Sequence, residues 1–342
     1  MTPERCAACG IELAPGLLAC PACRWLVHAD RLKALAAQAE AAEREGRLTD
    51  ALRPWREALD LLPAGTRQHE AVVASVRRLS QAVDREGSAP SPGAKGAAPG
   101  GRMAGLGAVG LLLWKLKFVA LAVLGKVKLL VTGLASLPTL FSMLAWVALD
   151  GRRGLWLTLG LVVSIYVHEM GHVAALRSYG IAATAPMFVP GLGALVRLHQ
   201  YPIDAREDAR VGLAGPVWGC VAAATALALG LALHEPTILR VASWGATINV
   251  FNLIPVWQLD GARGFRALDG RQRMITAAIA ATLALALGQT VGLAVAAAAG
   301  VRLRSDLPAE GDTRAFRTFV ALLVGLAAIT WAATPAAGGA AG

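Results

Sequence analysis

The sequence has few charged and few aromatic residues, and both shortages exclude a class of protein. Only 16% of its 342 residues are charged, whereas 56% are hydrophobic, so the composition is not that of a soluble globular protein. Aromatic residues make up 6%, and no basic run is interleaved with them, so we expect no nucleic-acid partner. The composition instead predicts that much of the chain lies in a lipid bilayer.

The N-terminus lacks the apolar segment of a cleavable signal peptide, because residues 1–12 contain charges and cysteines. We therefore expect the N-terminus to be cytoplasmic. Residues 1–100 carry 13 Lys and Arg against 12 Asp and Glu, so nine of the ten net positive charges belong to the remaining, apolar part. Such a surplus is typical of loops that face anionic lipid and the cytoplasm. The sequence thus predicts a multi-pass protein of the cell membrane.

Four of the five cysteines form two CxxC pairs near the N-terminus: Cys6, Cys9, Cys20 and Cys23. Four thiolates at this spacing can bind one Zn²⁺ tetrahedrally. The segment is too short to fold around a hydrophobic core, so a metal would have to hold it together. We expect a structural zinc ribbon over residues 1–25. A redox CxxC pair is the alternative, although the βαβ context that it requires is absent.

Residues 26–86 are predicted to form a helical cytoplasmic domain. Charged residues alternate with Ala and Leu at helical spacing, with breaks at 45–47 and 62–65, which indicates three helices. The stretch Leu48–Pro63 looks like the second helix of a tetratricopeptide hairpin, which would bind a cytoplasmic protein partner. An ordinary three-helix bundle explains the same pattern.

Two short segments follow this domain. Residues 87–101 are rich in Gly, Pro, Ala and Ser and are expected to be a flexible linker that tethers the N-terminal domain without fusing it rigidly. Residues 102–128 carry four lysines among apolar residues. This pattern is typical of basic interfacial or partly inserted helices.

Residues 129–342 contain several apolar runs long enough to cross a bilayer, since 19 to 23 helical residues span about 30 Å. We predict a mainly α-helical membrane protein with about 5–7 membrane helices. The run Met274–Val301 is interrupted by Gly288-Gln289, and it could form one tilted helix or a tight hairpin.

An HExxH motif lies in one of these runs. His168 and His172 are four residues apart and project from one face of a helix, so both can bind one metal ion, and Glu169 is placed to activate a metal-bound water. Three ionisable residues in a membrane helix are costly and usually persist only when they bind or react. Two buried histidines beside an unrelated glutamate are the less favoured interpretation.

A catalytic zinc site needs a third protein ligand, and Asp260 is the candidate. It comes directly after an uncharged run of nineteen residues and is followed by four arginines. By the positive-inside rule, those arginines place this end of the run on the cytoplasmic side.

These residues resemble the site-2 protease family of intramembrane zinc metalloproteases. Three elements carry the resemblance and occur in the family's order: the HEMGH sequence at 168–172, the LAGP sequence at 213–216, and Asn252-Leu-x-Pro-x-x-x-Leu-Asp260-Gly261. The resemblance covers about Leu129 to Arg273. No stretch resembles an inserted PDZ domain, and the appended N-terminal domains are more similar to those of some bacterial members.

The resemblance implies a role for each matching residue. His168, His172 and Asp260 would bind the catalytic zinc, Glu169 would be the general base, and Asn252 would hold the substrate or the developing oxyanion. Residues 187–197, with Gly191 and Gly193, look like the re-entrant β-hairpin that binds an unwound substrate.

The sequence therefore predicts an intramembrane zinc metalloendopeptidase that cleaves a membrane-anchored protein substrate within or next to its transmembrane segment. The alternative is a non-proteolytic membrane adaptor with a structural zinc site and a partner-binding cytoplasmic head. A metal-ion transporter is less favoured, because the ionisable residues cluster at one depth instead of lining a path.

Overall fold

The computed structural model describes residues 4–86, 137–182, 187–189, 193–195 and 202–338. Within these ranges the chain is mainly helical, with two small two-stranded sheets. The predicted fold class is confirmed: a helical membrane protein with a small β element, an N-terminal cysteine ribbon and a short helical domain. The predicted linker 87–101 and the basic segment 102–128 lie outside the described residues.

The N-terminal part is a small ribbon followed by three helices. Strands β1 (Glu4–Arg5) and β2 (Glu12–Leu13) pair antiparallel. Helices α1 (Ala29–Arg44), α2 (Leu48–Asp60) and α3 (Arg67–Glu86) come next. We call α1–α3 the head. Their apolar faces form one buried cluster around Leu52, Val76 and Leu79, so the amphipathic spacing of the sequence is what packs the three helices together.

The membrane part consists of helices packed side by side. Their bounds are α6 (Leu137–Ser178), α7 (Ala205–Leu233), α8 (Pro236–Asn252), α9 (Asp260–Arg266), α10 (Gly270–Leu287), α11 (Thr290–Val301) and α12 (Thr313–Gly338). Among the described residues, three stretches are long and apolar enough to cross a membrane, namely Gly154–Ser178, Ala205–Leu233 and Thr313–Thr334.

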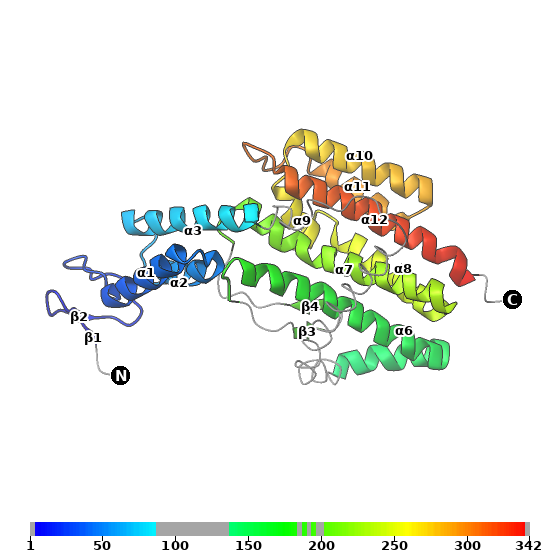
Figure 1. Cartoon of the computed structure of the whole chain (residues 1–342), viewed down its shortest axis with the longest axis horizontal. Helices are drawn as coiled ribbons and strands as arrows, with labels where there is room; N and C mark the ends of the chain where they lie inside the picture. Colours follow the sequence, from blue (N-terminus) through cyan, green and yellow to red (C-terminus); the bar gives the residue numbers. More distant parts are fainter. Residues whose placement is uncertain (1–3, 87–136, 183–186, 190–192, 196–201, 339–342) are drawn as a thin grey trace, which may run out of the picture.

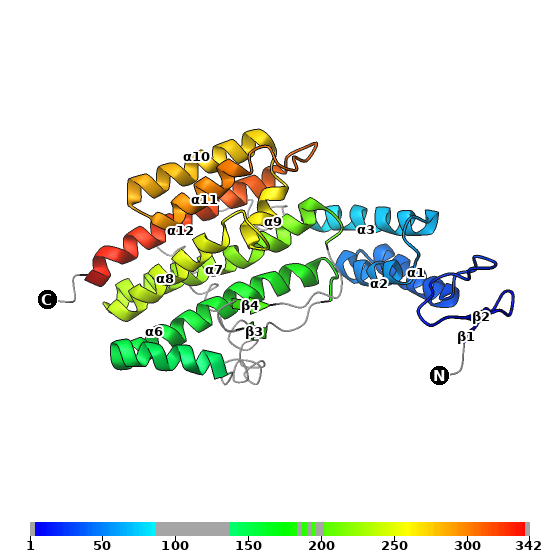
Figure 2. The ribbon, with the colours of Figure 1, turned by 180° about the vertical axis from the view of Figure 1, so that it is seen from behind.

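Helix α7 is central to this bundle, because it contacts α6, α8, α9 and α12. Figures 1 and 2 show α6 on one side of the bundle and α10, α11 and α12 on the other, with α7 and α8 between them. The head lies at one end, beside the end of α6 and the start of α7 (Figure 1). Helix α7 begins with Asp204 as its N-cap, whose carboxylate accepts a bond of 2.9 Å from the Glu207 N–H.

Two apolar runs are divided by turns: the first forms the tight hairpin that was one of its two expected forms, and the second is divided where no break was expected from the sequence. The run Met274–Val301 is a hairpin of α10 and α11, because Gly288 adopts a left-handed conformation with φ of 66° and ends α10. The run that ends at Leu259 leaves the helix at Asn252, so residues 253–259 form a connection between α8 and α9.

The β-hairpin expected at residues 187–197 from the family resemblance has its two strands between α6 and α7. Strands β3 (Met187–Val189) and β4 (Gly193–Leu195) pair antiparallel, with Val189 opposite Gly193. Strand β4 lies beside α6, the helix that carries the HExxH motif.

Candidate metal centres

Helix α6 presents the two histidines of the HExxH motif inside the bundle. His168 is 4% exposed and His172 is 7% exposed, and their rings meet edge to face with centroids 4.9 Å apart. A spacing of four residues places them on one face of the helix, one turn apart. Their Nε2 atoms are 3.1 Å from each other, which is the separation expected when two imidazoles point at a common position.

Asp260 reaches the same position from a different helix. It is the first residue of α9, and its Oδ2 lies 3.0 Å from His168 Nε2 while its Oδ1 lies 3.2 Å from His172 Nε2. The connection from α8 folds tightly before it: a Cβ at Gly261 would collide with the backbone of Leu253. Only glycine permits this close approach, and it brings the carboxylate back to the histidines.

The other ring nitrogens of the histidines face hydrogen-bond acceptors. His168 Nδ1 lies 2.8 Å from Asn249 Oδ1, and His172 Nδ1 lies 2.8 Å from the Val211 carbonyl. The Asn249 amide orients its oxygen toward the imidazole because its Nδ2 donates to the Gly245 carbonyl. Both Nδ1 atoms therefore carry the proton, and both Nε2 lone pairs point at Asp260. Partners of this kind fix the tautomer and the direction of metal-binding histidines.

The arrangement satisfies the requirements of a zinc site. Two Nε2 lone pairs and a carboxylate face each other at 3.0–3.2 Å, which is favourable only when a positive charge lies among them. Ligand bonds of about 2.0–2.2 Å in a tetrahedron place ligand atoms about 3.3–3.6 Å apart, a few tenths of an ångström more than these distances. Nitrogen and oxygen donors also match the preference of Zn²⁺. The three side chains could thus hold one ion and leave its fourth position free.

Glu169 follows His168 on the same helix and is 9% exposed. Its carboxylate lies within electrostatic reach of both histidines and of Asp260. The carboxylate is therefore near the cluster without belonging to it. This placement is the one that a proton acceptor beside a metal ligand set requires.

Glycines on α7 allow this helix to approach the cluster. A Cβ at Gly215 would overlap the imidazoles of His168 and His172, and a Cβ at Gly219 would overlap the side chain of Asn249. From sequence alone these glycines could equally be ordinary packing residues. The structure shows that their missing side chains leave the space that the ligands and their partner occupy.

The residues expected to bind substrate lie in different settings. Asn252 is the last residue of α8, half-buried and three residues after Asn249. Gly193 begins β4, whereas Gly191 lies outside the described residues. Sequence reasoning selected Asn252 and overlooked Asn249, although an amide in an apolar helix one turn earlier is a comparable signal.

The four N-terminal cysteines form a second cluster. Cys6 Sγ lies 3.6 Å from Cys23 Sγ, Cys9 Sγ lies 3.6 Å from Cys20 Sγ, and all four sulfur atoms are within 4.8 Å of one another. These separations are far longer than a disulfide bond. They match a tetrahedron of thiolates around Zn²⁺, in which each Zn–S bond is about 2.3 Å.

The two CxxC turns have the same backbone geometry. The N–H of Gly10 donates to the Cys6 carbonyl and that of Arg24 donates to the Cys20 carbonyl, each over 2.9 Å. Both donors have positive φ, 76° at Gly10 and 61° at Arg24. The backbone N–H of Cys9 lowers the pKa of the Cys6 thiol to about 6. Each turn therefore directs amide dipoles at its first sulfur and favours the thiolate that metal binding needs.

We predict that Gly215→Ala weakens zinc binding at the histidine–aspartate cluster by about 10- to 100-fold, the usual loss when a group that positions a ligand is disturbed. The added methyl group would occupy the space of the two imidazoles. Gly300→Ala in α11 is the matched control, because a Cβ there meets no atom within 4 Å. Chelator competition on the purified proteins measures both. Equal zinc affinity for the two variants would contradict this account of Gly215.

We also predict that Asn249→Ala lowers zinc affinity by about 10- to 100-fold, because His168 would lose the acceptor that orients its ring. Asn249→Asp should retain most of the affinity, since a carboxylate accepts the same hydrogen bond. Metal analysis during titration with a chelator distinguishes the two. Wild-type affinity in the alanine variant would show that the histidine is oriented without Asn249.

Comparison with known proteins agrees with the geometry. Residues 156–242 match the sequence profile of Peptidase family M50. The zinc metalloprotease MJ0392 of Methanocaldococcus jannaschii is 26% identical over 113 residues, which are 32% of this chain and 32% of that protein. The probable chloroplastic zinc metalloprotease EGY1 of Arabidopsis thaliana is 24% identical over 178 residues, 38% of this chain and 32% of that protein.

A third relative, the probable chloroplastic zinc metalloprotease EGY2 of Oryza sativa, is 29% identical over 167 residues, which are 36% of this chain and 30% of that protein. The matched part of the chain thus spans about a third of the length of these curated relatives. No solved structure matches significantly. The profile match includes both histidines of the cluster and the glycines of α7 that pack against them, so residues 156–242 are similar to Peptidase family M50, the site-2 protease family.

Proposed function

We propose that the chain is an intramembrane zinc metalloendopeptidase that cleaves a membrane-anchored protein within or next to a transmembrane segment. The observation that carries the proposal is the convergence of two Nε2 lone pairs and one carboxylate within an apolar helix bundle. The match to Peptidase family M50 and the similarity to zinc metalloproteases support the same chemistry. Because those relatives match over only about a third of their length, the proposal depends on the site itself.

In this proposal His168, His172 and Asp260 hold the catalytic Zn²⁺, and the four N-terminal cysteines hold a second, structural Zn²⁺. When bound, the catalytic ion would polarise the scissile carbonyl and lower the pKa of a coordinated water to about 7. Glu169 accepts the proton of the attacking water and later delivers it to the leaving amine. Its burial beside the cluster keeps this transfer away from bulk solvent.

The substrate has to be unwound before its peptide bond can react, because a transmembrane helix hides each carbonyl in its own hydrogen bonds. In hydrocarbon, the freed backbone groups would remain unsatisfied. We propose that β4 supplies replacement bonds by strand addition, since this strand lies beside α6. Asn252, at the end of α8, would hold the extended segment or the developing oxyanion.

We further propose that the protein is located in the cell membrane with its N-terminus in the cytoplasm. The basic surplus of the apolar part supports this orientation. The polar surface of the ribbon and the head also supports it, since most of their charged side chains are exposed.

We expect Glu169→Gln to lower the rate of peptide cleavage by about 100- to 10,000-fold, the usual effect of removing a general base. The amide has nearly the same size as the carboxylate but cannot accept the proton. Zinc content should be unchanged, because Glu169 is not in the ligand set. The matched control is Glu235→Gln, which makes the same chemical change at an exposed residue before α8.

The substrate for this assay can be found with the same variant. Proteins that remain bound to Glu169→Gln purified from membranes are identified, and each is then incubated with wild-type protein to test for cleavage. If the zinc-loaded glutamine variant cleaved such a substrate as fast as wild type, the proposed role of Glu169 would be wrong. If it also retained full activity in cells while deletion of residues 1–86 abolished that activity, the adaptor function would be favoured.

A further inference from the structure

The head packs against the membrane part through a buried interface. A flexible linker alone, as expected from the sequence, would leave the position of the head relative to the membrane helices undefined. The apolar side of this interface joins Ile203 to the buried cluster of the head. Gly180, with φ of 69°, lies so close to α2 that a Cβ there would be 2.8 Å from the backbone nitrogen of Arg53. Two segments that flank α6 and α7 are therefore packed against the head.

Arg56 of α2 forms the most buried polar contact of the interface. Its Nε donates to the carbonyl of Tyr179 over 2.6 Å, and its Nη2 donates to the carboxylate of Glu207. The Arg56 and Glu207 side chains are both 2% exposed. Tyr179 follows the last residue of α6 and Glu207 lies in the first turn of α7. One guanidinium of the head thus joins the end of α6 to the start of α7.

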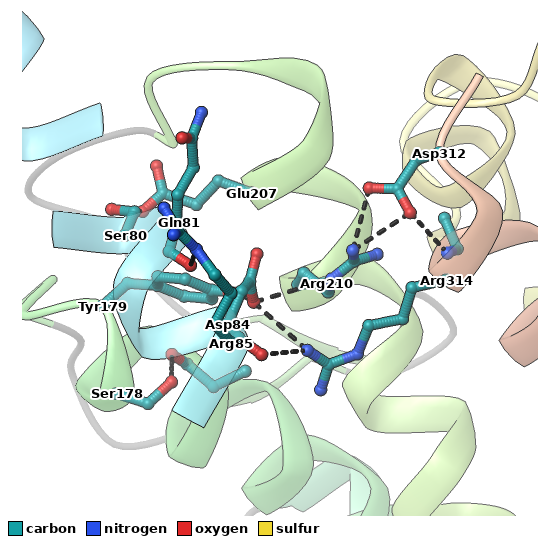
Figure 3. Close-up of polar contacts among 12 residues, drawn as sticks. Ser80, Gln81, Asp84, Arg85, Ser178, Tyr179, Glu207, Arg210, Asp312 and Arg314 are labelled. Carbon is teal, nitrogen blue, oxygen red and sulfur yellow. Dashed lines mark hydrogen bonds and ion pairs between the residues drawn. The ribbon is translucent and has the colours of Figure 1, made fainter. Parts of the chain in front are cut away.

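Asp84 of α3 adds a second set of contacts, with Tyr179 just after α6 and with helices α7 and α12, which Figure 3 shows in part. The Tyr179 hydroxyl donates to its Oδ1 over 2.6 Å. The guanidinium groups of Arg210 and Arg314 lie 3.6 and 3.5 Å from the same atom. Arg210 in turn donates to both oxygens of Asp312, so the contacts continue to the start of α12.

These contacts lie close to the metal ligands along both helices. His172 is seven residues before Tyr179, or about 10 Å along α6, and Val211 is one turn, or about 6 Å, after Glu207. The His172–Val211 hydrogen bond joins the two helices directly, so its length depends on how α6 and α7 are spaced. The covalent connection between them runs from residue 179 to 204 and includes strands β3 and β4.

We propose that the head is a positioning element of the zinc site: Arg56 and Asp84 hold the ends of α6 and α7 at the spacing that lets Val211 orient His172. The inference rests on the proposed zinc site and extends it, because it assigns the head a role in metal binding and not only in recruiting partners. Arg56 is a positioning residue, since it would act on the metal ligands only through Tyr179 and Glu207, which its guanidinium contacts. Any event that pulls the head away from α6 and α7 would weaken the site.

Zinc affinity of full-length protein in detergent tests the proposal. We expect Arg56→Met to weaken zinc binding by about 10- to 100-fold, the loss typical of disturbed ligand orientation. Arg56→Lys should lie between this variant and wild type, because an ammonium group cannot reproduce the planar, forked donor set of arginine. The matched control is Arg31→Met in the same head, because Arg31 forms an exposed ion pair with Glu57 and should bind zinc as wild type does.

Each variant is compared with a version that also carries His172→Ala, so that zinc held by the cysteines is subtracted. A purely structural role predicts a lower melting temperature with wild-type zinc affinity in the folded fraction, and that result would overturn the proposal. If Arg56→Met does not fold, Arg56→Lys and Asp84→Ala decide, with the exposed Asp50→Ala as control. Wild-type affinity in both would also overturn it.

The two proposals fail in different ways. If wild-type protein lost no zinc on His172→Ala, the proposed zinc site would be wrong, and with it the positioning role. If the His172-dependent zinc were present and unaffected by Arg56 and Asp84, only the positioning role would be wrong. If zinc affinity followed the head variants while Glu169→Gln remained fully active, the positioning role would stand and the proposed catalytic role of Glu169 would fall.

Discussion

Two imidazole nitrogens and a carboxylate face one another at 3.0–3.2 Å inside a bundle of apolar helices. In such surroundings an uncompensated cluster of lone pairs is costly, because burial removes most of the water that would otherwise solvate it. The rest of the membrane part is arranged around this constraint. Asn249 and the Val211 carbonyl accept the outward-facing Nδ1 protons, and the inward-facing atoms can be satisfied by one cation.

Close packing of α7 makes this cluster possible. Gly215 and Gly219 face the histidines and Asn249 at distances that no side chain would tolerate. In membrane proteins small residues allow helices to approach and gain van der Waals contacts. Here the approach also has a chemical consequence, since it brings the Val211 carbonyl within hydrogen-bond distance of His172. The close packing of α7 against α6 therefore also orients His172.

The N-terminal head extends this arrangement beyond the membrane helices. A buried ion pair such as Arg56–Glu207 contributes little net stability when it forms, because both charges lose their hydration, yet removing one partner is strongly destabilising. Such a pair is suited to specifying one arrangement of the parts that it joins. Together with the contacts of Asp84, it defines where the head docks, at the ends of the helices that carry the two histidines of the proposed metal site and the carbonyl that orients one of them.

Local chemistry in the sequence determined the mainly helical class and predicted the candidate metal ligands. Histidines four residues apart share a helix face whatever the tertiary structure, and two CxxC turns direct four sulfurs to one point. Uncharged runs predicted membrane helices but not where each ends, because Gly288 and the turn after Asn252 are decided by backbone conformation and not by hydrophobicity.

Only the tertiary structure decided the residues that support the cluster. The acceptors at Asn249 and Val211 lie 81 and 39 positions from the histidines that they orient. Arg56 lies 151 positions from Glu207. No periodicity or motif links residues so far apart. These pairs form only when the helices pack, because a buried polar group needs a hydrogen-bond or charge partner and the folded chain determines which group lies beside it.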